Sequence, residues 1–302
     1  MTIVVAGEAL IDLVPHGAGV LHAHAGGGPY NTARTLGRLG LDVQYLGCLS
    51  GDAFGARLRA RLTEDGVRLD TAVATPLPTT LALAELDARG AASYRFYAEG
   101  TSAPALEPAA ALAVLPERVD ALHVGTLGLI LEPTALALQA VVEAVADRAL
   151  VMVDPNCRPT LIDDHDTYRR SLAATLAYTH VVKVSNDDLE YLSPGADPVD
   201  AARELLADGP RVVLVTLGAD GALIVTADGV EAVPAPPAIV VDTIGAGDAF
   251  GGGFLARLHS RAQLDDPAAV RAATAFACAV AARTCERAGA DPPRRSELDG
   301  DL

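Results

Sequence analysis

The sequence predicts an α/β protein, a three-layer α/β/α sandwich with a mostly parallel, doubly wound sheet and a small β-sheet lid. Two observations support this fold. Short valine-rich runs that end in a polar residue or glycine alternate with longer amphipathic stretches, which is typical of parallel strands joined by right-handed helical crossovers. One segment, residues 71–98, instead alternates with a period of two, which is typical of an antiparallel hairpin.

Apolar runs at regular intervals are expected to form the buried strands. Each is short, rich in valine and followed by a polar or glycine turn, as in parallel strands that are covered on both faces. These runs are TIVVAGEAL (2–10), ALHVGTL (121–127), ALVMVDPN (149–156), HVVKVS (180–185) and RVVLVTLG (211–218).

Amphipathic stretches between these runs are expected to form helices. Some end in glycine and others begin with an acid or proline, as helix termini prefer. The stretches are YNTARTLGRLG (30–40), AFGARLRARLTEDG (53–66), PTALALQAVVEAVADR (133–148) and DPVDAARELLADG (197–209).

The period-two segment is expected to form a lid outside the parallel sheet. Its strands flank DARG at 87–90, a turn sequence between two apolar runs. Residues 13–27 are a second candidate for the same antiparallel flap. We therefore predict one domain over residues 1–302, with a lid from approximately 13–26 and 71–100.

The charge composition limits the partners of the protein. Its formal net charge is −16, which argues against a protein that wraps nucleic acid by neutralising phosphates. Of the 23 Lys and Arg residues only Lys183 is a lysine. A phosphate must therefore be held mainly by arginine, by backbone N–H groups or by a metal.

The four cysteines indicate a reducing compartment. No pair has the C-x-x-C spacing of a zinc or redox site, so buried reduced thiols are expected. Residues 1–14 carry two acids and no basic leader, unlike a signal peptide. No apolar run reaches the roughly 18 uncharged residues of a membrane helix. We expect a cytoplasmic protein with no membrane partner.

The stretch VVDTIGAGDAFGGGFLARL at 240–258 places one acid, Asp248, among glycines at the start of a helix. Free N–H groups and the helix dipole make such a turn an anion site. Gly245, Ala246 and Gly247 would let a phosphate approach closely. An acid beside a phosphate is useful if it removes a proton from a hydroxyl, so we interpret Asp248 as a general base.

Other interpretations of this stretch stay open. Asp248 could simply cap its helix, because Asp is favoured at helix starts. A dinucleotide fingerprint is disfavoured, because Phe250 occupies the place of its third glycine and the motif lies near the C-terminus. No Walker sequence is present.

A second glycine turn, AGGGPYNTARTLGRLG at 25–40, has Asn31 in its first helical turn. An amide both donates and accepts, which suits a sugar diol. Asp12, after the first strand, could accept from a further hydroxyl. Asn31 could equally be an ordinary helix-start residue.

Together the two glycine stretches resemble the signatures of the ribokinase-like (PfkB) carbohydrate kinases, an early G-G-x-x-x-N-x-A-x-x-L-x-x-L-G and a late D-T-x-G-A-G-D-x-F. Here they are GGGPYNTARTLGRLG and DTIGAGDAF. The resemblance continues at GEALIDLVP, DPNCRP, VKVSNDDLEYL and TLGADGAL, and so spans nearly the whole chain.

The resemblance implies transfer of the ATP γ-phosphoryl group to a sugar hydroxyl, with Mg²⁺ and a monovalent cation such as K⁺ as cofactors. It gives each site residue an expected role. Asp248 matches the base and Gly245, Ala246 and Gly247 the anion hole; Asp12, Gly27, Gly28 and Asn31 match sugar-binding positions; Lys183, Ser185, Thr216, Gly218 and Gly221 fall on the nucleotide side; Asp242 and the Ile244 carbonyl match a monovalent cation site.

The chain departs from the family pattern in places. Where the family often has N-x-x-E near magnesium, this chain has Ser185 and Asp188, so Asp188 is expected to reach the metal through water, and Asn186 is the competing ligand. Gly28 replaces a lysine and Leu10 an asparagine of ribokinases, which weakens a ribose assignment.

The motifs look most like those of fructokinases, so fructose is the favoured acceptor; a 2-keto-3-deoxygluconate kinase, a ribokinase or a nucleoside kinase are alternatives. Arg95 on the lid and Arg158 after DPNC are the candidate cations for the sugar or a phosphate, although Arg95 could also be an ordinary exposed strand residue. The lid is also a candidate homodimer contact. Hypotheses of another class are an NAD-binding Rossmann oxidoreductase and a non-catalytic sugar sensor. Residues 292–302 are expected to form a loose tail.

Overall fold

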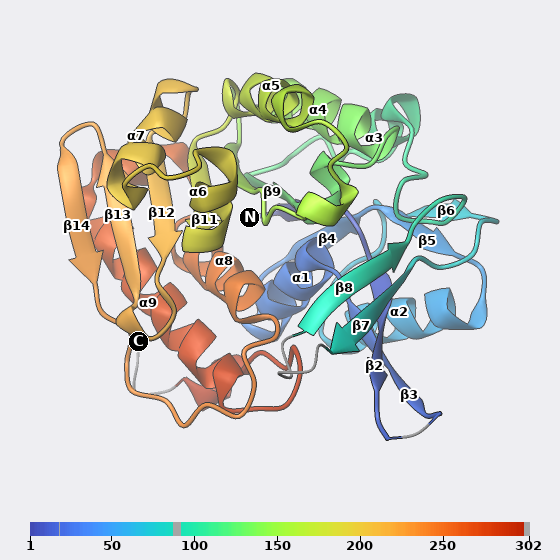
Figure 1. Cartoon of the computed structure of the whole chain (residues 1–302). Helices are drawn as coiled ribbons and strands as arrows, with labels where there is room; N and C mark the ends of the chain where they lie inside the picture. Colours follow the sequence, from blue (N-terminus) through green and yellow to red (C-terminus); the bar gives the residue numbers. More distant parts are fainter. Residues whose placement is uncertain (18, 87–91, 299–302) are drawn as a thin grey trace.

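The computed structural model describes residues 1–17, 19–86 and 92–298. Its centre is an eight-stranded sheet in the order β14-β13-β12-β11-β10-β9-β1-β4 (Figure 1). Its strands β4, β1, β9, β10, β11 and β12 run parallel to one another. At the other end β13 pairs antiparallel with β12, and β14 pairs antiparallel with β13. The predicted mostly parallel, doubly wound sheet is confirmed.

Five strands of this sheet, β1, β9, β10, β11 and β12, lie within the predicted valine-rich runs, whereas β4, β13 and β14 were not predicted. The strands of the sheet are β1 (Ile3–Ala6), β4 (Val43–Leu46), β9 (Ala121–Gly125), β10 (Leu150–Asp154), β11 (Val181–Ser185), β12 (Val212–Thr216), β13 (Ala222–Thr226) and β14 (Gly229–Val233).

Helices cover both faces of the sheet and complete the three layers (Figure 1). They are α1 (Gly28–Arg38), α2 (Ala53–Glu64), α3 (Pro108–Val114), α4 (Thr134–Val145), α5 (His165–Leu176), α6 (Asn186–Leu192), α7 (Pro198–Ala207), α8 (Ala246–Arg257) and α9 (Pro267–Cys285). Short 3₁₀ turns lie at Thr126–Leu129, Pro159–Leu161, Gly218–Asp220, Arg261–Asp265 and Arg295–Glu297.

Each face of the sheet has its own apolar core, because successive strand side chains point to opposite sides. In β1, Val4 and Ala6 pack in the core with α3 to α7, whereas Ile3 and Val5 pack in the core with α1, α2, α8 and α9. This division explains why the parallel strands are apolar at every position rather than alternating.

The predicted strand over 2–10 proved to be two strands. β1 ends at Ala6, Gly7 takes a φ of 145°, and β2 (Leu10–Pro15) belongs to another sheet. A side chain at Gly7 would collide with Pro29 at the start of α1, so close packing requires glycine there. The chain therefore changes direction inside the stretch that was predicted to be one strand.

A four-stranded sheet in the order β3-β2-β7-β8 stands beside the large sheet, formed by β2, β3 (Leu21–Gly26), β7 (Leu81–Leu86) and β8 (Ala92–Tyr97). β7 and β8 pair antiparallel, which confirms the hairpin, although its DARG turn lies outside the described residues. The beginning of the period-two segment does not join this sheet. Instead β6 (Val73–Thr75) pairs with β5 (Cys48–Ser50) in a separate two-stranded sheet.

Helix α9 is the one helix of the described chain with the length and apolar composition of a membrane span. It contains Arg271 and Arg283, and half of the apolar stretch is buried inside the protein. Its apolar face packs in the core with α8, as expected of a core helix.

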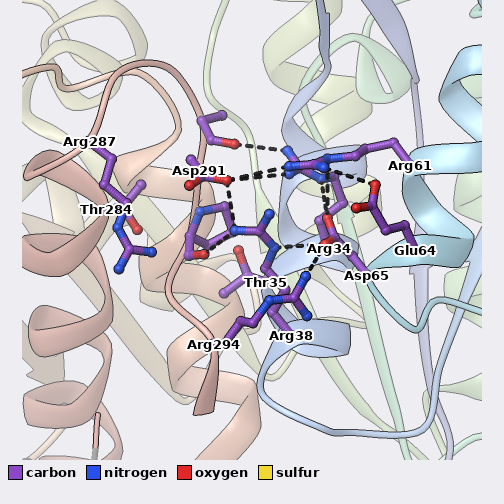
Figure 2. A network of polar contacts seen from close by, with 12 residues as sticks. Arg34, Thr35, Arg38, Arg61, Glu64, Asp65, Thr284, Arg287, Asp291 and Arg294 are labelled. Atoms are coloured by element: carbon purple, nitrogen blue, oxygen red, sulfur yellow. Dashed lines mark hydrogen bonds and ion pairs between the residues drawn. The ribbon is translucent and has the colours of Figure 1, made fainter. Parts of the chain in front are cut away.

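Residues 292–298 do not form the loose tail that the sequence suggested. Pro292, Pro293 and Leu298 are buried, and an ionic network holds this segment to α1 and α2 (Figure 2). At its centre Asp65 is fully buried and accepts hydrogen bonds from Arg34 at 2.7 Å and Arg38 at 2.8 Å.

The arginines of this network reach beyond Asp65 to the C-terminal segment. Arg34 donates to the Ala290 carbonyl at 2.8 Å, Arg38 to that of Pro292, and Arg38 also pairs with Asp291 at 2.7 Å. The pKa of Asp65 is lowered, because hydrogen bonds from both arginines outweigh the effect of burial. A buried carboxylate thus ties the last described residues to the first half of the chain.

We expect Asp65→Asn to lower the free energy of unfolding by about 3–5 kcal/mol, because it leaves buried arginine charge without a counterion. Glu64→Gln is the control, since Glu64 is 59% exposed and its pair with Arg61 is worth at most about 1 kcal/mol. Urea unfolding of both variants at neutral pH measures the difference. Equal stability of the two variants would contradict a structural role for the network.

Candidate active site

A cavity of about 520 Å³ opens at the carboxyl ends of the parallel strands. It lies where the chain order reverses between β1 and β9, the usual binding position in doubly wound sheets. The residues that line it come from every third of the chain. They are Glu8, Leu10, Asp12, Gly27, Gly28, Asn31, Tyr94, Phe96, Thr126, Leu127, Asn156, Arg158, Lys183, Ser185, Asp187, Asp188, Thr216, Thr243, Ile244, Gly245, Gly247 and Asp248.

Asp248 lies buried in the first turn of α8. The helix is capped by Gly245, in left-handed conformation with a φ of 76°, and no side chain caps it, so the helix-cap interpretation of Asp248 is wrong. Its Oδ2 accepts a hydrogen bond of 2.9 Å from Asn31 Nδ2. Burial raises the pKa of Asp248 to about 6, although the bond from Asn31 lowers it. Such a pKa suits a proton acceptor near neutrality.

The turn before α8 presents free amides to the cavity. The N–H groups of Gly245 and Gly247 have no acceptor within the described part of the chain, whereas Ala246 N–H donates to the Thr243 carbonyl at 3.2 Å. Gly245 packs closely against Ala290, so a side chain there would not fit. Of the three predicted anion-hole amides, those of Gly245 and Gly247 thus have no hydrogen-bond acceptor within the described residues.

Lys183 lies directly under this turn. It is 3% exposed, and its Nζ is 2.7 Å from Asp154 Oδ2 and 3.0 Å from the position of a Cβ on Gly247. Burial alone would lower the pKa of Lys183, but attraction to Asp154, Asp188 and Asp248 outweighs it, and the pKa is raised. The chain's single lysine is therefore a buried positive charge behind the glycine amides.

Asp12 and Arg158 both line the cavity. Burial raises the pKa of Asp12 to about 7, the charge of Asp248 adds to the rise, and Arg158 opposes it. Arg158 Nη1 is held by the carbonyl of Asn156 at 2.7 Å and by its side-chain oxygen at 2.6 Å. Both predicted sugar-side residues thus line the cavity.

Arg95 does not line the cavity, contrary to the sequence prediction. It is 62% exposed and pairs with Glu85 at 2.8 Å on the outer face of the small sheet. Its neighbours Tyr94 and Phe96 line the cavity instead. The reason is the period of a strand, since adjacent side chains point to opposite faces.

Ser185 and Asp188 form a capping box at the start of α6. Asp188 Oδ2 accepts from the N–H and hydroxyl of Ser185, and Oδ1 accepts from Cys157 N–H at 2.7 Å. Oδ2 thus uses both of its lone pairs, whereas Oδ1 keeps one free for a further contact. Of the neighbours, Asp187 lines the cavity and Asn186 does not.

The remaining predicted residues spread around the opening. Thr216 lines the cavity, Gly218 is exposed beside it, and Gly221 is buried against the backbone of Val233. Asp242 lines a neighbouring cavity of about 660 Å³, and Ile244 lines both cavities.

Asp242 fixes the loop at this boundary. Its Oδ1 accepts from Ile244 N–H at 3.1 Å and its Oδ2 from Gly289 N–H at 2.8 Å. The carboxylate thus joins the approach to α8 to the loop that precedes the C-terminal segment.

Sequence reasoning missed several residues of the cavity. Glu8 is buried and accepts from Gly28 N–H at 3.0 Å and from Gly128 N–H at 3.2 Å, and burial raises its pKa to about 8. Thr126 and Asn156, which line the cavity, were also overlooked, as was Asp154, the partner of Lys183. All follow or end a parallel strand, and that position at the ligand-binding edge was the available signal.

Comparison with known proteins agrees with this geometry. The family model described as pfkB family carbohydrate kinase matches residues 2–296. A fructokinase of Rhizobium leguminosarum bv. trifolii is 35% identical over 256 residues, covering 83% of this chain and 78% of that protein. Fructokinase-1 of Oryza sativa subsp. japonica is 35% identical over 305 residues, covering 97% and 94%.

Solved structures of similar proteins share the fold. A fructokinase with bound ATP from Xylella fastidiosa superposes with a TM-score of 0.89 at 29% identity, over 99% of this chain and 97% of that one. Aminoimidazole riboside kinase from Salmonella enterica, complexed with aminoimidazole riboside and an ATP analog, gives 0.86 at 29% identity, over 100% and 99%. A fructokinase double mutant from Vibrio cholerae O395 with fructose, ADP and potassium ion gives 0.88 at 25% identity, over 100% and 98%.

The glycine turn with its buried aspartate, the two-layered helical cover of the sheet and a match over nearly the whole length lead to one conclusion: the chain belongs to the pfkB family of carbohydrate kinases.

Proposed function

We propose that the protein is a fructokinase, which transfers the γ-phosphoryl group of ATP to a hydroxyl of fructose. The observation that carries the proposal is the place of Asp248. It is a buried carboxylate with raised pKa, beside free helix N-terminal amides and inside a cavity lined by sugar-type polar groups. The combination supports deprotonation of an alcohol next to a phosphate.

In the proposed mechanism Asp248 accepts the proton of the acceptor hydroxyl as the hydroxyl oxygen bonds to the γ-phosphorus. The bond from this phosphorus to the bridging oxygen breaks, and ADP leaves. Asn31 keeps the carboxylate oriented through its 2.9 Å hydrogen bond. The amides of Gly245 and Gly247 donate to the phosphoryl oxygens, and the buried charge of Lys183 adds to the positive potential there. Positioning and electrostatics of this kind provide most of the catalysis in phosphoryl transfer.

Mg²⁺ is the proposed companion of ATP, and it would neutralise charge on the β- and γ-phosphates. The described residues contain no group of three or more metal-ligating side chains, so an all-protein magnesium site is not expected. This fits an ion that keeps several waters and binds chiefly through phosphates. Asp187, which faces the cavity, and Asp188 would hold those waters.

A monovalent cation is proposed at Asp242 and the Ile244 carbonyl. The fructokinase of Vibrio cholerae O395 contains a potassium ion. Here both oxygens of Asp242 already accept backbone N–H groups, which would orient the carboxylate for an ion without consuming its remaining lone pairs. The loop that would carry the ion leads directly into the anion-hole turn.

Further parts of the proposal follow from the fold. The four-stranded sheet would act as a lid over the sugar, since Asp12, Tyr94 and Phe96 point from it into the cavity. Its edge strands β3 and β8 are where a homodimer would form. We place the enzyme in the cytoplasm, because its four cysteines are free thiols.

A coupled ADP-release screen tests the proposal across fructose, ribose, 2-keto-3-deoxygluconate, adenosine and aminoimidazole riboside, with and without K⁺. We expect fructose to give the highest kcat/KM, because the curated relatives are fructokinases. The aminoimidazole riboside kinase structure makes a nucleoside the second candidate. Binding without turnover on every sugar would indicate a sensor. The NAD-dependent oxidoreductase hypothesis is excluded by the family membership.

Asp248→Asn is expected to lower kcat by about 10²–10⁴-fold, because the amide cannot accept the proton. The KM for the sugar should change little, since shape and the contact to Asn31 remain. Asp200→Asn, at an exposed residue of α7, is the matched control and should retain full turnover. Steady-state kinetics measure both, and turnover of Asp248→Asn within tenfold of wild type would rule out the base.

The pH dependence provides an independent check. Asp248 must be ionised to act, and its pKa of about 6 and that of Asp12 near 7 predict that kcat/KM rises with pH through this range and then levels off. Because the two carboxylates repel each other, the rise of kcat/KM with pH reflects the titration of both groups together. Asn31→Ala should shift the rise of kcat/KM to higher pH, because the substitution removes the hydrogen bond that lowers the pKa of Asp248. A pH profile of Asn31→Ala that matches wild type would contradict the effect of Asn31 on the pKa of Asp248.

A further inference from the structure

Thr126 has an unusual backbone conformation at the edge of the active-site cavity. It follows β9 with a φ of 53°, and Asn156 is the other non-glycine residue of the described chain with a positive φ. A β-branched residue rarely adopts this region, and such strain is typically kept where a side chain must be aimed for function. Asn156 holds Arg158, so its conformation already has an explanation. That of Thr126 does not.

The side chain of Thr126 is buried but free. It lines the cavity, and its hydroxyl has no hydrogen-bond partner within residues 1–17, 19–86 and 92–298. A methyl group added to Gly28 would collide with Thr126 Oγ1 and lie 3.4 Å from Asp248 Oδ1. The hydroxyl and the catalytic carboxylate therefore flank the same small space, which the missing side chain of Gly28 leaves open.

Glu8 fixes the width of this space. One of its carboxylate oxygens accepts from Gly28 N–H and the other from Gly128 N–H, so a single buried side chain holds both turns. The Thr126 hydroxyl is thus placed at a set distance from the glycine turn and from Asp248. An unpaired hydroxyl held rigidly in a cavity is suited to recognise a ligand oxygen.

We propose that Thr126 is a specificity-determining residue, whose hydroxyl hydrogen-bonds to a sugar oxygen close to the hydroxyl that Asp248 deprotonates. The inference rests on the proposed function and deepens it. The Thr126 hydroxyl selects small acceptors that carry an oxygen at this position over acceptors that lack it. Because the contact is made to the bound sugar before and during transfer, its loss raises the KM for sugar more than it lowers kcat.

Matched variants test the role of the hydroxyl. Thr126→Val keeps the β-branched shape and removes the hydroxyl; we expect its sugar KM to rise about tenfold, the effect of one lost hydrogen bond, with kcat and the KM for ATP within twofold of wild type. Thr126→Ser restores the hydroxyl and should restore the KM. Thermal unfolding of both variants should match wild type, so that folding does not account for the change.

Sugar analogues that lack one oxygen at a time identify the partner. Wild type should lose about tenfold in kcat/KM on one analogue, and Thr126→Val should lose nothing more on that same analogue, since the pair is already broken. Equal sugar KM values for wild type and Thr126→Val would overturn this inference but leave the proposed function intact. Losses in kcat/KM that multiply on every analogue would do the same. A wild-type enzyme that neither binds nor phosphorylates any sugar overturns the proposed function and this inference with it.

Discussion

The hydrogen bond between Asn31 and Asp248 is the constraint on which the site depends. It joins the first turn of α1 to the first turn of α8, which are 217 residues apart in the chain. Both helices begin at the same edge of the sheet, and a second bond, from Thr32 to the Asp248 carbonyl, reinforces the contact. The carboxylate is thereby buried yet oriented, as the proposed role of Asp248 as a general base requires.

The positions of the buried charged residues matter more to the site than the net charge of the chain. The chain has an excess of acids, yet its single lysine lies buried beneath the turn before α8, where Asp154 holds it. Four arginines pair with Asp65 and fasten the segment after α9 to α1 and α2 (Figure 2): Arg34, Arg38, Arg61 and Arg294. Because that segment also touches Gly245 through Ala290, the ionic network supports the geometry of the turn.

The residues that sequence reasoning placed correctly lie on elements with a regular period or in glycine turns. Asn31, Gly28 and Asp248 fall at helix starts after glycine, and each lines the cavity as expected. The errors arose where one residue of register decides the outcome. Arg95 points outward because Tyr94 and Phe96 point inward, and the run over 2–10 breaks at Gly7 because Pro29 of a later helix packs against it.

The sequence by itself determined the α/β class, five strands of the large sheet and the two glycine turns, because these depend on local periodicity and backbone freedom. Only the tertiary structure decided that Glu8 spans two turns, that Lys183 lies beneath Gly247, and that the Thr126 hydroxyl faces the base. The physical reason is that burial and long-range pairing set the charge and direction of these side chains. Neither quantity exists until segments more than a hundred residues apart are packed together.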